Sequence, residues 1–238
     1  MPSRCRVVLT ILTYYVYAPV SALHPPCPSL ARYDFCRYVV GSYIFCCKTY
    51  QLVGINLKEN VMSIVHTVPV EKASGKVSEI YGQISQVFGR VPNGMQLYSS
   101  SPDMLDQQWQ GLSYYMKHPT LSFPLLAMIR LLVSERHDCE YCIGMNASLL
   151  INVAGLSEDQ VLETRRNPEK APLSEKELKL LLTVLKAVES PKEINRDDLG
   201  ELRSAGWTDS EIIDAVAHGA RNVSADIMFN TFKVVNDF

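Results

Sequence analysis

Apolar side chains recur every three or four residues along most of the chain after residue 70, the spacing of one face of an α-helix. A first stripe consists of Val77, Ile80, Tyr81, Ile84, Val87 and Phe88. Gly89 and the turn at 91–94 end it. A second stripe runs through Leu105, Trp109, Leu112 and Met116. Residues 123–134 are apolar on almost every side, which predicts a helix buried from several directions.

Capping boxes predict where the later helices begin. In a capping box, the side chain of the first residue and that of the residue three positions later each accept a hydrogen bond from the other residue's backbone N–H group. These begin at Ser157, Ser174 and Thr208. Two further stripes follow, Leu178, Leu181, Leu182 with Leu185, and Ile212, Ile213, Val216 with Ala220. No alternating strand pattern is present. The sequence predicts one all-α, multi-helix domain over residues 62–238.

Residues 1–61 have a different composition from the rest of the chain. They carry six of the 23 basic residues, two of the 25 acidic residues and five of the seven cysteines. One interpretation is a secretory signal, because Arg4 and Arg6 precede an apolar run that ends near residue 22. A membrane anchor is a second, although the run is short for a span and contains Pro19.

A third interpretation is that natural translation starts at Met62. Lys58 and Glu59 can be encoded by a purine-rich sequence that recruits bacterial ribosomes, at a suitable distance before this methionine. We expect residues 1–61 to be such an upstream segment or a leader, outside the folded domain. The location is then cytoplasmic, or exported if residues 1–22 are a signal peptide.

The overall charge excludes one class of partner. Basic and acidic residues nearly balance, with a formal net charge of −2, so nothing favours binding to nucleic acid. We expect no membrane partner either. Asn146 and Asn222 each begin a glycosylation pattern, but both fall inside predicted helices. His218 also lies on a predicted helix and is expected to be a core or interface residue.

The chemical signal is a pair of cysteines, Cys139 and Cys142, at the start of a predicted helix. Asp138 is the expected N-cap, which places Cys139 in the first turn and Cys142 one turn further on. Backbone N–H groups at a helix start stabilise a thiolate, and two cysteines at this spacing can close a small disulfide ring. Arg136 and His137 add positive charge and a proton donor beside the pair.

A cysteine pair at this spacing also has structural, metal-binding and haem-binding interpretations. Buried cysteines often serve as small apolar residues. A zinc site needs four ligands, and His137 and His218 are the candidates to complete one. Haem attachment requires a histidine after Cys142, where Ile143 stands, and a thioredoxin needs βαβ units. Redox chemistry on a helical scaffold is favoured, with no bound metal or cofactor expected.

The stretch from Ile129 to Ala154 resembles the carboxymuconolactone decarboxylase superfamily, in its alkylhydroperoxidase-D-like branch. The segment from Gly206 to Ile213 is also similar to that family, and the resemblance spans residues 62–238. It implies an all-helical fold, assembly as a homotrimer or homohexamer, and peroxide reduction by the cysteine pair. Peroxidase members have a glutamate and a histidine as a proton relay, at the positions of Ala127 and Asn146 here.

That departure leaves the relay open. Asn146 can hydrogen-bond a thiolate but cannot accept its proton at neutral pH. Glu135 or His137 could substitute for the missing groups. Position at the helix start favours Cys139 as the attacking thiol, whereas the resemblance favours Cys142, with Cys139 as the resolving thiol.

Two functional hypotheses follow. The first is a peroxidase-type thiol oxidoreductase that acts on a peroxide or other small oxidant and is reduced by an unidentified thiol donor. Its candidate catalytic residues are Cys139, Cys142, His137, Glu135 and Asn146. The second is a non-enzymatic redox sensor or scaffold of the same fold. The apolar faces at 123–134 and 178–188 exceed what a small helical monomer buries easily, which adds to the expectation of subunit association.

Overall fold

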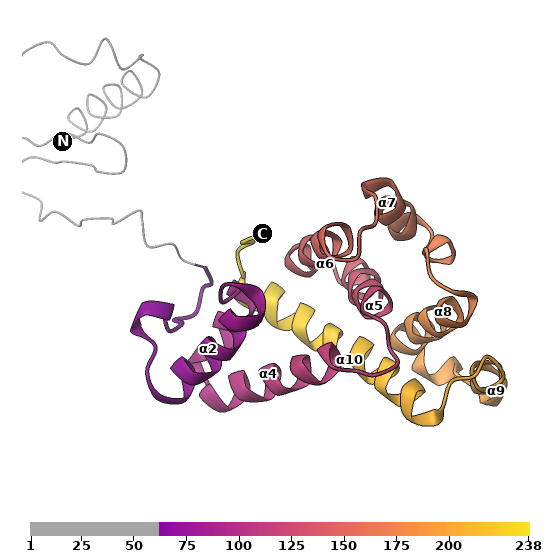
Figure 1. Cartoon of the computed structure of the whole chain (residues 1–238), viewed down its shortest axis with the longest axis horizontal. Helices are drawn as coiled ribbons and strands as arrows, with labels where there is room; N and C mark the ends of the chain where they lie inside the picture. The colour runs from indigo at the N-terminus through magenta and orange to yellow at the C-terminus, as the bar shows by residue number, and fades with distance from the viewer. Residues whose placement is uncertain (1–61) are drawn as a thin grey trace, which may run out of the picture. The chain divides into compact units, whose positions relative to one another are not determined.

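The chain folds into helices over residues 62–238, the part that the computed structural model describes (Figure 1). Within these residues there is no strand, which confirms the all-α prediction. The predictions for residues 1–61 lie outside the described residues. The α-helices, in chain order, are α2 (Gly75–Phe88), α3 (Asn93–Gln96), α4 (Pro102–Met116), α5 (Phe123–Arg136), α6 (Glu140–Asn152), α7 (Glu158–Arg166), α8 (Glu175–Glu189), α9 (Arg196–Ser204) and α10 (Asp209–Phe232).

The helix starts follow from local side-chain chemistry. The predicted capping boxes at Ser157, Ser174 and Thr208 are all formed, and each starts its helix as expected. Asn195 forms a fourth box at the start of α9, whose side chain accepts from two backbone N–H groups. Because these caps satisfy donors that a helix start otherwise leaves without partners, they fix where α7 to α10 begin.

Helix α5 is the central element of the fold. Nine of its residues are buried, from Leu125 to Ser134, and it packs against α6, α7, α8 and α10. The apolar residues of α8 that face it, including Leu181 and Leu185, are buried as well. The apolar surplus at 123–134 and 178–188 is therefore covered largely within the chain, so it gives no support to subunit association, which stays a prediction.

Helix α10, yellow in Figure 1, is the longest helix and packs against both α5 and α8. Its buried face differs from the predicted stripe, since Ile213 is 67% exposed and Ala220 is exposed too. The buried positions are Ile212, Ala215, His218, Gly219, Asn222, Asp226 and Phe229. Three of these are polar, and they follow one another at intervals of four residues. The buried face of α10 thus carries a polar stripe along α5.

A glycine permits the close packing of α10 on α8. A Cβ atom at Gly219 would lie 2.8 Å from Cγ1 of Val184 and 3.1 Å from Cγ2 of Val188. Both distances are shorter than normal carbon contacts, so a larger residue here would push the helices apart.

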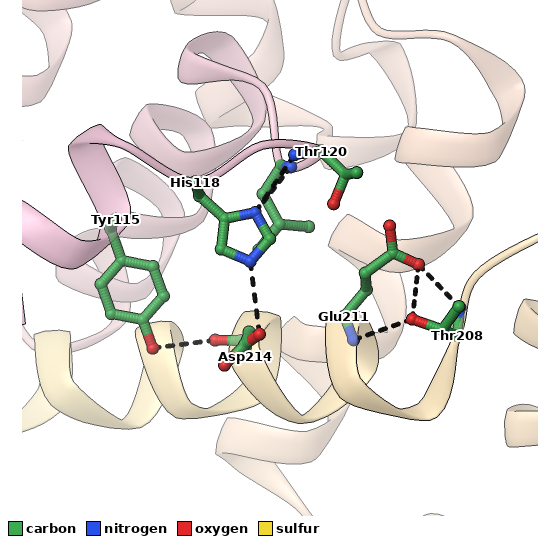
Figure 2. A network of polar contacts seen from close by, with 7 residues as sticks. Tyr115, His118, Thr120, Thr208, Glu211 and Asp214 are labelled. Carbon is green, nitrogen blue, oxygen red and sulfur yellow. Dashed lines mark hydrogen bonds and ion pairs between the residues drawn. The ribbon is translucent and has the colours of Figure 1, made fainter.

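The N-terminal end of α10 is fastened to the connection between α4 and α5 (Figure 2). Nδ1 of His118 accepts from the backbone N–H groups of Thr120 and Leu121, at 3.3 and 3.0 Å, and Nε2 lies 3.3 Å from Oδ2 of Asp214. The hydroxyl of Tyr115 donates to the backbone carbonyl of Asp214 at 3.0 Å. These contacts fix α10 relative to α5 at one end.

The core consists of two hydrophobic clusters. One surrounds α5, α8 and the N-terminal part of α10. The other joins α2, the region of α3 and α4, Phe229 of α10, and both cysteines of the pair. Val77, Ile80, Tyr81 and Ile84 of the first predicted stripe lie in this second cluster, whereas Val87 and Phe88 at its end are 53% and 36% exposed. The candidate site therefore lies inside the core.

Candidate active site

The turn between α5 and α6 positions the two cysteines. Helix α5 ends at Arg136, Asp138 adopts a left-handed φ of 48°, and Cys139 is the N-cap residue of α6. The expected N-cap, Asp138, is therefore wrong by one residue. The backbone N–H of Cys139 donates to the carbonyl of Ser134 at 3.1 Å, which folds the start of α6 back onto α5. Cys142 follows one turn further along α6.

Both cysteines are free thiols, and both are buried, with exposed fractions of 0% and 1%. Their sulfur atoms and a carboxylate oxygen of Asp226 all lie within 4.8 Å of one another. Asp226 is fully buried and comes from the polar stripe of α10. The three groups converge from two helices that are distant in the sequence.

The carboxylate of Asp226 is held by hydrogen-bond donors on both of its oxygens. The hydroxyl of Ser134 donates to Oδ1 at 2.8 Å, and the side-chain amide of Asn222 donates to Oδ2 at 3.0 Å. The same amide donates to Oγ of Ser134 at 2.8 Å, so these side chains form a closed network. Both sulfur atoms also lie within 4.8 Å of an oxygen of this carboxylate. The orientation of Asp226 toward the sulfurs is thus fixed.

Burial and mutual contact shift the acidity of these groups. Burial raises the pKa of Asp226, although the thiols and Ser134 oppose that shift by donating to the carboxylate. The hydrogen bond with Cys139 raises the pKa of the Cys142 thiol, and burial and the negative charge of Asp226 raise it further. Cys142 is therefore a neutral thiol at pH 7 in this conformation. A thiolate forms only if the proton has somewhere to go.

A positive charge lies beside the pair. Arg130 of α5 donates from Nε to Oδ1 of Asn146 at 2.7 Å, and its Nη1 lies 3.1 Å from Nε2 of His218. Burial lowers the pKa of Arg130 to about 10, while interaction with Cys142 acts in the opposite direction. The guanidinium is cationic at neutral pH and favours a thiolate at Cys142. Burial and this cation lower the pKa of His218 to about 3, so the imidazole is neutral there.

Asn146 lies close to the thiols but makes other bonds than the one expected. Its side-chain amide donates to the backbone carbonyl of Cys142 at 2.8 Å, and its Oδ1 accepts from Arg130. It is fully buried. In this state Asn146 orients Arg130 instead of hydrogen-bonding a sulfur atom.

The other two candidates lie at the end of α5. The carboxylate of Glu135 forms an ion pair with Arg165 of α7. The backbone carbonyl of His137 accepts a hydrogen bond from the side chain of Asn230 at 2.9 Å. The interaction with His137 lowers the pKa of Asp226. The structure therefore brings His137 near the carboxylate and pairs Glu135 with a different helix.

The last residues of the chain cover the outer side of α6. The carboxylate of Asp237 accepts from the backbone N–H of Asn93 at 2.8 Å and from the hydroxyl of Tyr141 at 3.0 Å. The ring of Phe238 occupies the space beside Gly144, where a Cβ atom would lie 2.5 Å from Cε2. Tyr141 directly precedes Cys142, so this packing helps to close the core around the pair.

Sequence analysis missed four residues that surround the thiols: Arg130, Ser134, Asn222 and Asp226. The first two interrupt the apolar run of 123–134 at an interval of four, and the last two continue from His218 at the same interval. Polar residues at helical spacing on an otherwise apolar face were the available signal. It was obscured because Asn222 was considered as a glycosylation pattern and the stripe on α10 was placed one residue away.

The zinc site weighed from the sequence would need His137 and His218 as further ligands, and neither joins the two thiols. Cys139, Cys142 and Asp226 offer three donor atoms, but no fourth His, Cys, Asp or Glu joins them among residues 62–238. Both oxygens of Asp226 already accept hydrogen bonds, and a structural zinc site has four protein ligands. The donor set is complete without a metal, and we assign none. In the same part of the chain, no helix is both long and apolar enough to cross a bilayer.

The comparisons with known proteins identify the fold. No protein-family model matches the sequence, and no curated protein matches it significantly. Among solved structures, an uncharacterised peroxidase-related protein from Ralstonia eutropha JMP134, described as an alkylhydroperoxidase AhpD core, superposes with a TM-score of 0.65. It is 22% identical, over 74% of this chain and 93% of the other.

Two further structures have the same fold. A peroxidase-related protein from Silicibacter sp. TM1040 gives a TM-score of 0.65 at 20% identity, over 76% of this chain and 94% of that one. The debrominase Bmp8 gives 0.61 at 14% identity, over 75% and 93%. The resemblance to alkylhydroperoxidase-D-like proteins is confirmed at the level of the fold.

Proposed function

We propose that the chain is a thiol-dependent oxidoreductase of the peroxidase type, in which Cys139 and Cys142 reduce a peroxide and close to a disulfide. The observation that carries this proposal is the contact between two free thiols and one buried carboxylate at the start of α6. A pair of cysteines three residues apart in a helix has Cα atoms close enough for a disulfide. The peroxidase-related proteins of the same fold support the proposal.

The reaction balances without any bound cofactor. The Cys142 thiolate attacks one peroxide oxygen, the O–O bond breaks, and the products are a sulfenic acid at Cys142 and an alcohol or water. Cys139 then attacks that sulfur, which releases water and forms the disulfide. A thiol donor of unidentified nature returns the disulfide to two thiols. The peroxide is reduced by two electrons, and the cysteine pair supplies them.

Cys142 is the better candidate for the first attack. Arg130 places a positive charge near it, whereas the side chain of Cys139 makes no capping hydrogen bond to the N–H groups at the start of α6. The helix-start argument for Cys139 is weakened by this missing bond, since a thiolate there would have to move to gain it. We therefore assign attack to Cys142 and resolution to Cys139.

A redox sensor is the second candidate, and the burial of both thiols favours it. A sulfur atom with almost no exposed surface meets an oxidant only when the surrounding core opens locally. Catalytic turnover also requires that a reductant reach the disulfide. A fold alone does not determine the substrate, since the debrominase Bmp8 shares this one.

The test combines trapping with turnover. We expect Cys139→Ser to accumulate a sulfenic acid on Cys142, located by peptide mapping after treatment with hydrogen peroxide, because the neighbouring thiol that would resolve it is removed. Cys142→Ser should lose the label and the reaction. Wild-type protein should form the disulfide between Cys139 and Cys142, identified by peptide mapping, and should consume peroxide continuously with dithiothreitol.

Two results would contradict the proposal. Unchanged labelling and turnover in both single variants would show that the pair is not the active site. Oxidation that stops after one equivalent of peroxide, even with excess dithiothreitol, would favour the sensor. Assembly as a homotrimer or homohexamer and a cytoplasmic location remain predictions. Light scattering at several protein concentrations would check the assembly.

A further inference from the structure

The proposed chemistry needs a group that moves protons, and the positions expected for it cannot do so. Ala127 has no ionisable group, and both polar atoms of the Asn146 side chain are already hydrogen-bonded. Peroxide attack requires that the thiol lose its proton and that the departing oxygen gain one. Some other residue must perform both transfers.

Asp226 has the geometry for this task. One of its oxygens and the two sulfur atoms lie within 4.8 Å of one another, and all three groups are buried. Ser134 and Asn222 hold the carboxylate from the side of α5 and α10, so that it cannot rotate away from the sulfurs. A fully buried carboxylate with only neutral donors around it is costly to retain.

The surrounding charges leave Asp226 available as a base. Arg130 on α5 forms its polar contacts with Asn146 and His218. His137, which follows the last residue of α5, lowers the pKa of the Asp226 carboxylate. Tyr98, on the 3-10 turn Leu97–Ser100, has its pKa raised to about 12 by burial and by Cys142, and stays neutral. Cys139 and Cys142 on α6 are the ionisable partners in contact.

We propose that the carboxylate of Asp226 is the proton acceptor and donor for both thiols, an inference that rests on the proposed function. Asp226 takes the proton of Cys142 as the sulfur attacks peroxide, and returns it to the departing alkoxide or hydroxide. It then takes the proton of Cys139 and gives it to the hydroxide that leaves the sulfenic acid. Two thiols and one peroxide become a disulfide, an alcohol and water, and Asp226 ends ionised as it began.

Acidity supports these transfers without carrying them. Proton transfer is efficient when the pKa values of donor and acceptor are brought closer to each other. Burial raises the pKa of Asp226 above that of an exposed aspartate. The pKa of the carboxyl group is therefore closer to that of a thiol than it would be in water. The raised pKa of Cys142 at the same time makes a base necessary at neutral pH.

The experiment measures single-turnover oxidation by hydrogen peroxide against pH in wild type and Asp226→Asn. Samples are quenched by alkylation, and the free thiols of Cys139 and Cys142 are quantified by peptide mapping. At pH 7 we expect the variant to be slower by about 100-fold, a typical effect of general base catalysis. At alkaline pH the order should reverse, because loss of the negative charge lowers the pKa of Cys142. A crossing of the two profiles is the expected result.

Two other profiles would overturn the inference. If Asp226→Asn is faster at every pH, the carboxylate only repels the thiolate and takes no proton. If the two profiles coincide, Asp226 has a structural role alone. Absence of disulfide formation in the wild type is a separate result, and it would overturn the proposed function as well.

Ser134→Ala provides a second measurement that does not remove the carboxylate. The hydroxyl of Ser134 lowers the pKa of Asp226, so its loss should raise that pKa. The acid limb of the oxidation profile, where Asp226 becomes protonated, should then move to higher pH. An unshifted limb in a variant that unfolds cooperatively would contradict the proposal, even if Asp226→Asn does not fold.

Discussion

Two polar networks, one partly buried and one fully buried, lie along α10, about 18 Å apart if the helix rises 1.5 Å per residue between Asp214 and Asp226. We call the group of His118, Asp214 and Tyr115 the imidazole network (Figure 2). The group of Cys139, Cys142, Ser134, Asn222 and Asp226 is the thiol network. Each contains an aspartate on the same helix.

The imidazole network resembles catalytic machinery, because a histidine contacts a carboxylate. Its atoms, however, are already used by the fold. Nδ1 of His118 accepts two backbone N–H groups, and the ring thereby closes the turn before α5. The thiol network contains no histidine in contact with a sulfur, but it holds two free thiols and a buried carboxylate. A candidate active site is thus distinguished from a structural contact by reactive groups that the fold does not already engage, more than by residue type.

The largest expected effect separates the two networks by activity. Cys142→Ser should reduce peroxide turnover by about 1000-fold or more, because the thiolate is itself the nucleophile. His118→Ala should leave turnover within about threefold of wild type, since the imidazole touches no reacting atom. The measurement is peroxide consumption with dithiothreitol, on variants matched for helical content. Equal losses of turnover in the two variants would contradict the distinction between a reactive and a structural network.

The two aspartates should also affect stability in opposite directions. The pKa of Asp226 is raised in the folded state by burial, so its ionisation opposes folding as the pH rises above the unfolded value near 4. Asp226→Asn should therefore increase the free energy of unfolding at pH 7, because it removes the cost of burying the ionised carboxylate. Below about pH 4 the gain should vanish.

Asp214→Asn is the matched variant in the imidazole network. It weakens the contact with His118 and should lower the free energy of unfolding by about 0.5–1 kcal/mol at pH 7. Urea denaturation of all three proteins at pH 4, 5.5 and 7 provides the comparison, and differences from wild type cancel contributions from other groups. A loss of stability in Asp226→Asn that does not depend on pH would contradict the expected desolvation cost.

The sequence was sufficient for the parts of the fold that depend on local chemistry. Ser157, Ser174 and Thr208 begin their helices where predicted, because a capping box satisfies backbone groups within four residues. The cysteine pair was recognised for the same reason, since its two thiols lie one turn apart on a single helix.

The rest of the site depends on contacts between distant segments. Ser134 and Asp226 are 92 residues apart in the chain, and their hydrogen bond exists only because α10 packs on α5 in one register. The interval of four residues from His218 to Asn222 and Asp226 predicts that they share a face, but not which helix that face meets. The exposure of Ile213 shows how a stripe displaced by one residue hides such a face.

Arg130, which lies beside the thiol network, tests whether a nearby positive charge assists the reaction of Cys142. Arg130→Met removes the cation near Cys142 and should slow single-turnover oxidation at pH 7 by about tenfold, or about 1.4 kcal/mol. The rise of the rate with pH should move to higher pH, because the thiolate loses a favourable interaction. Arg136→Met is the control, since Arg136 pairs with Glu189 at the surface. Equal rates in both variants would show that Arg130 serves Asn146 and the fold alone.

The last prediction concerns the stability of the imidazole network alone. His118→Ala removes the acceptor of two backbone N–H groups and should lower the free energy of unfolding by about 1–2 kcal/mol. His118→Asn should recover part of this loss, because an asparagine side-chain oxygen can accept from backbone N–H groups two or three residues ahead. Stability should therefore decrease from wild type to His118→Asn to His118→Ala, while single-turnover oxidation stays the same in all three. If the imidazole instead served the reaction through its proton, asparagine would rescue stability but not the oxidation rate, and the two networks would have to be treated as one site.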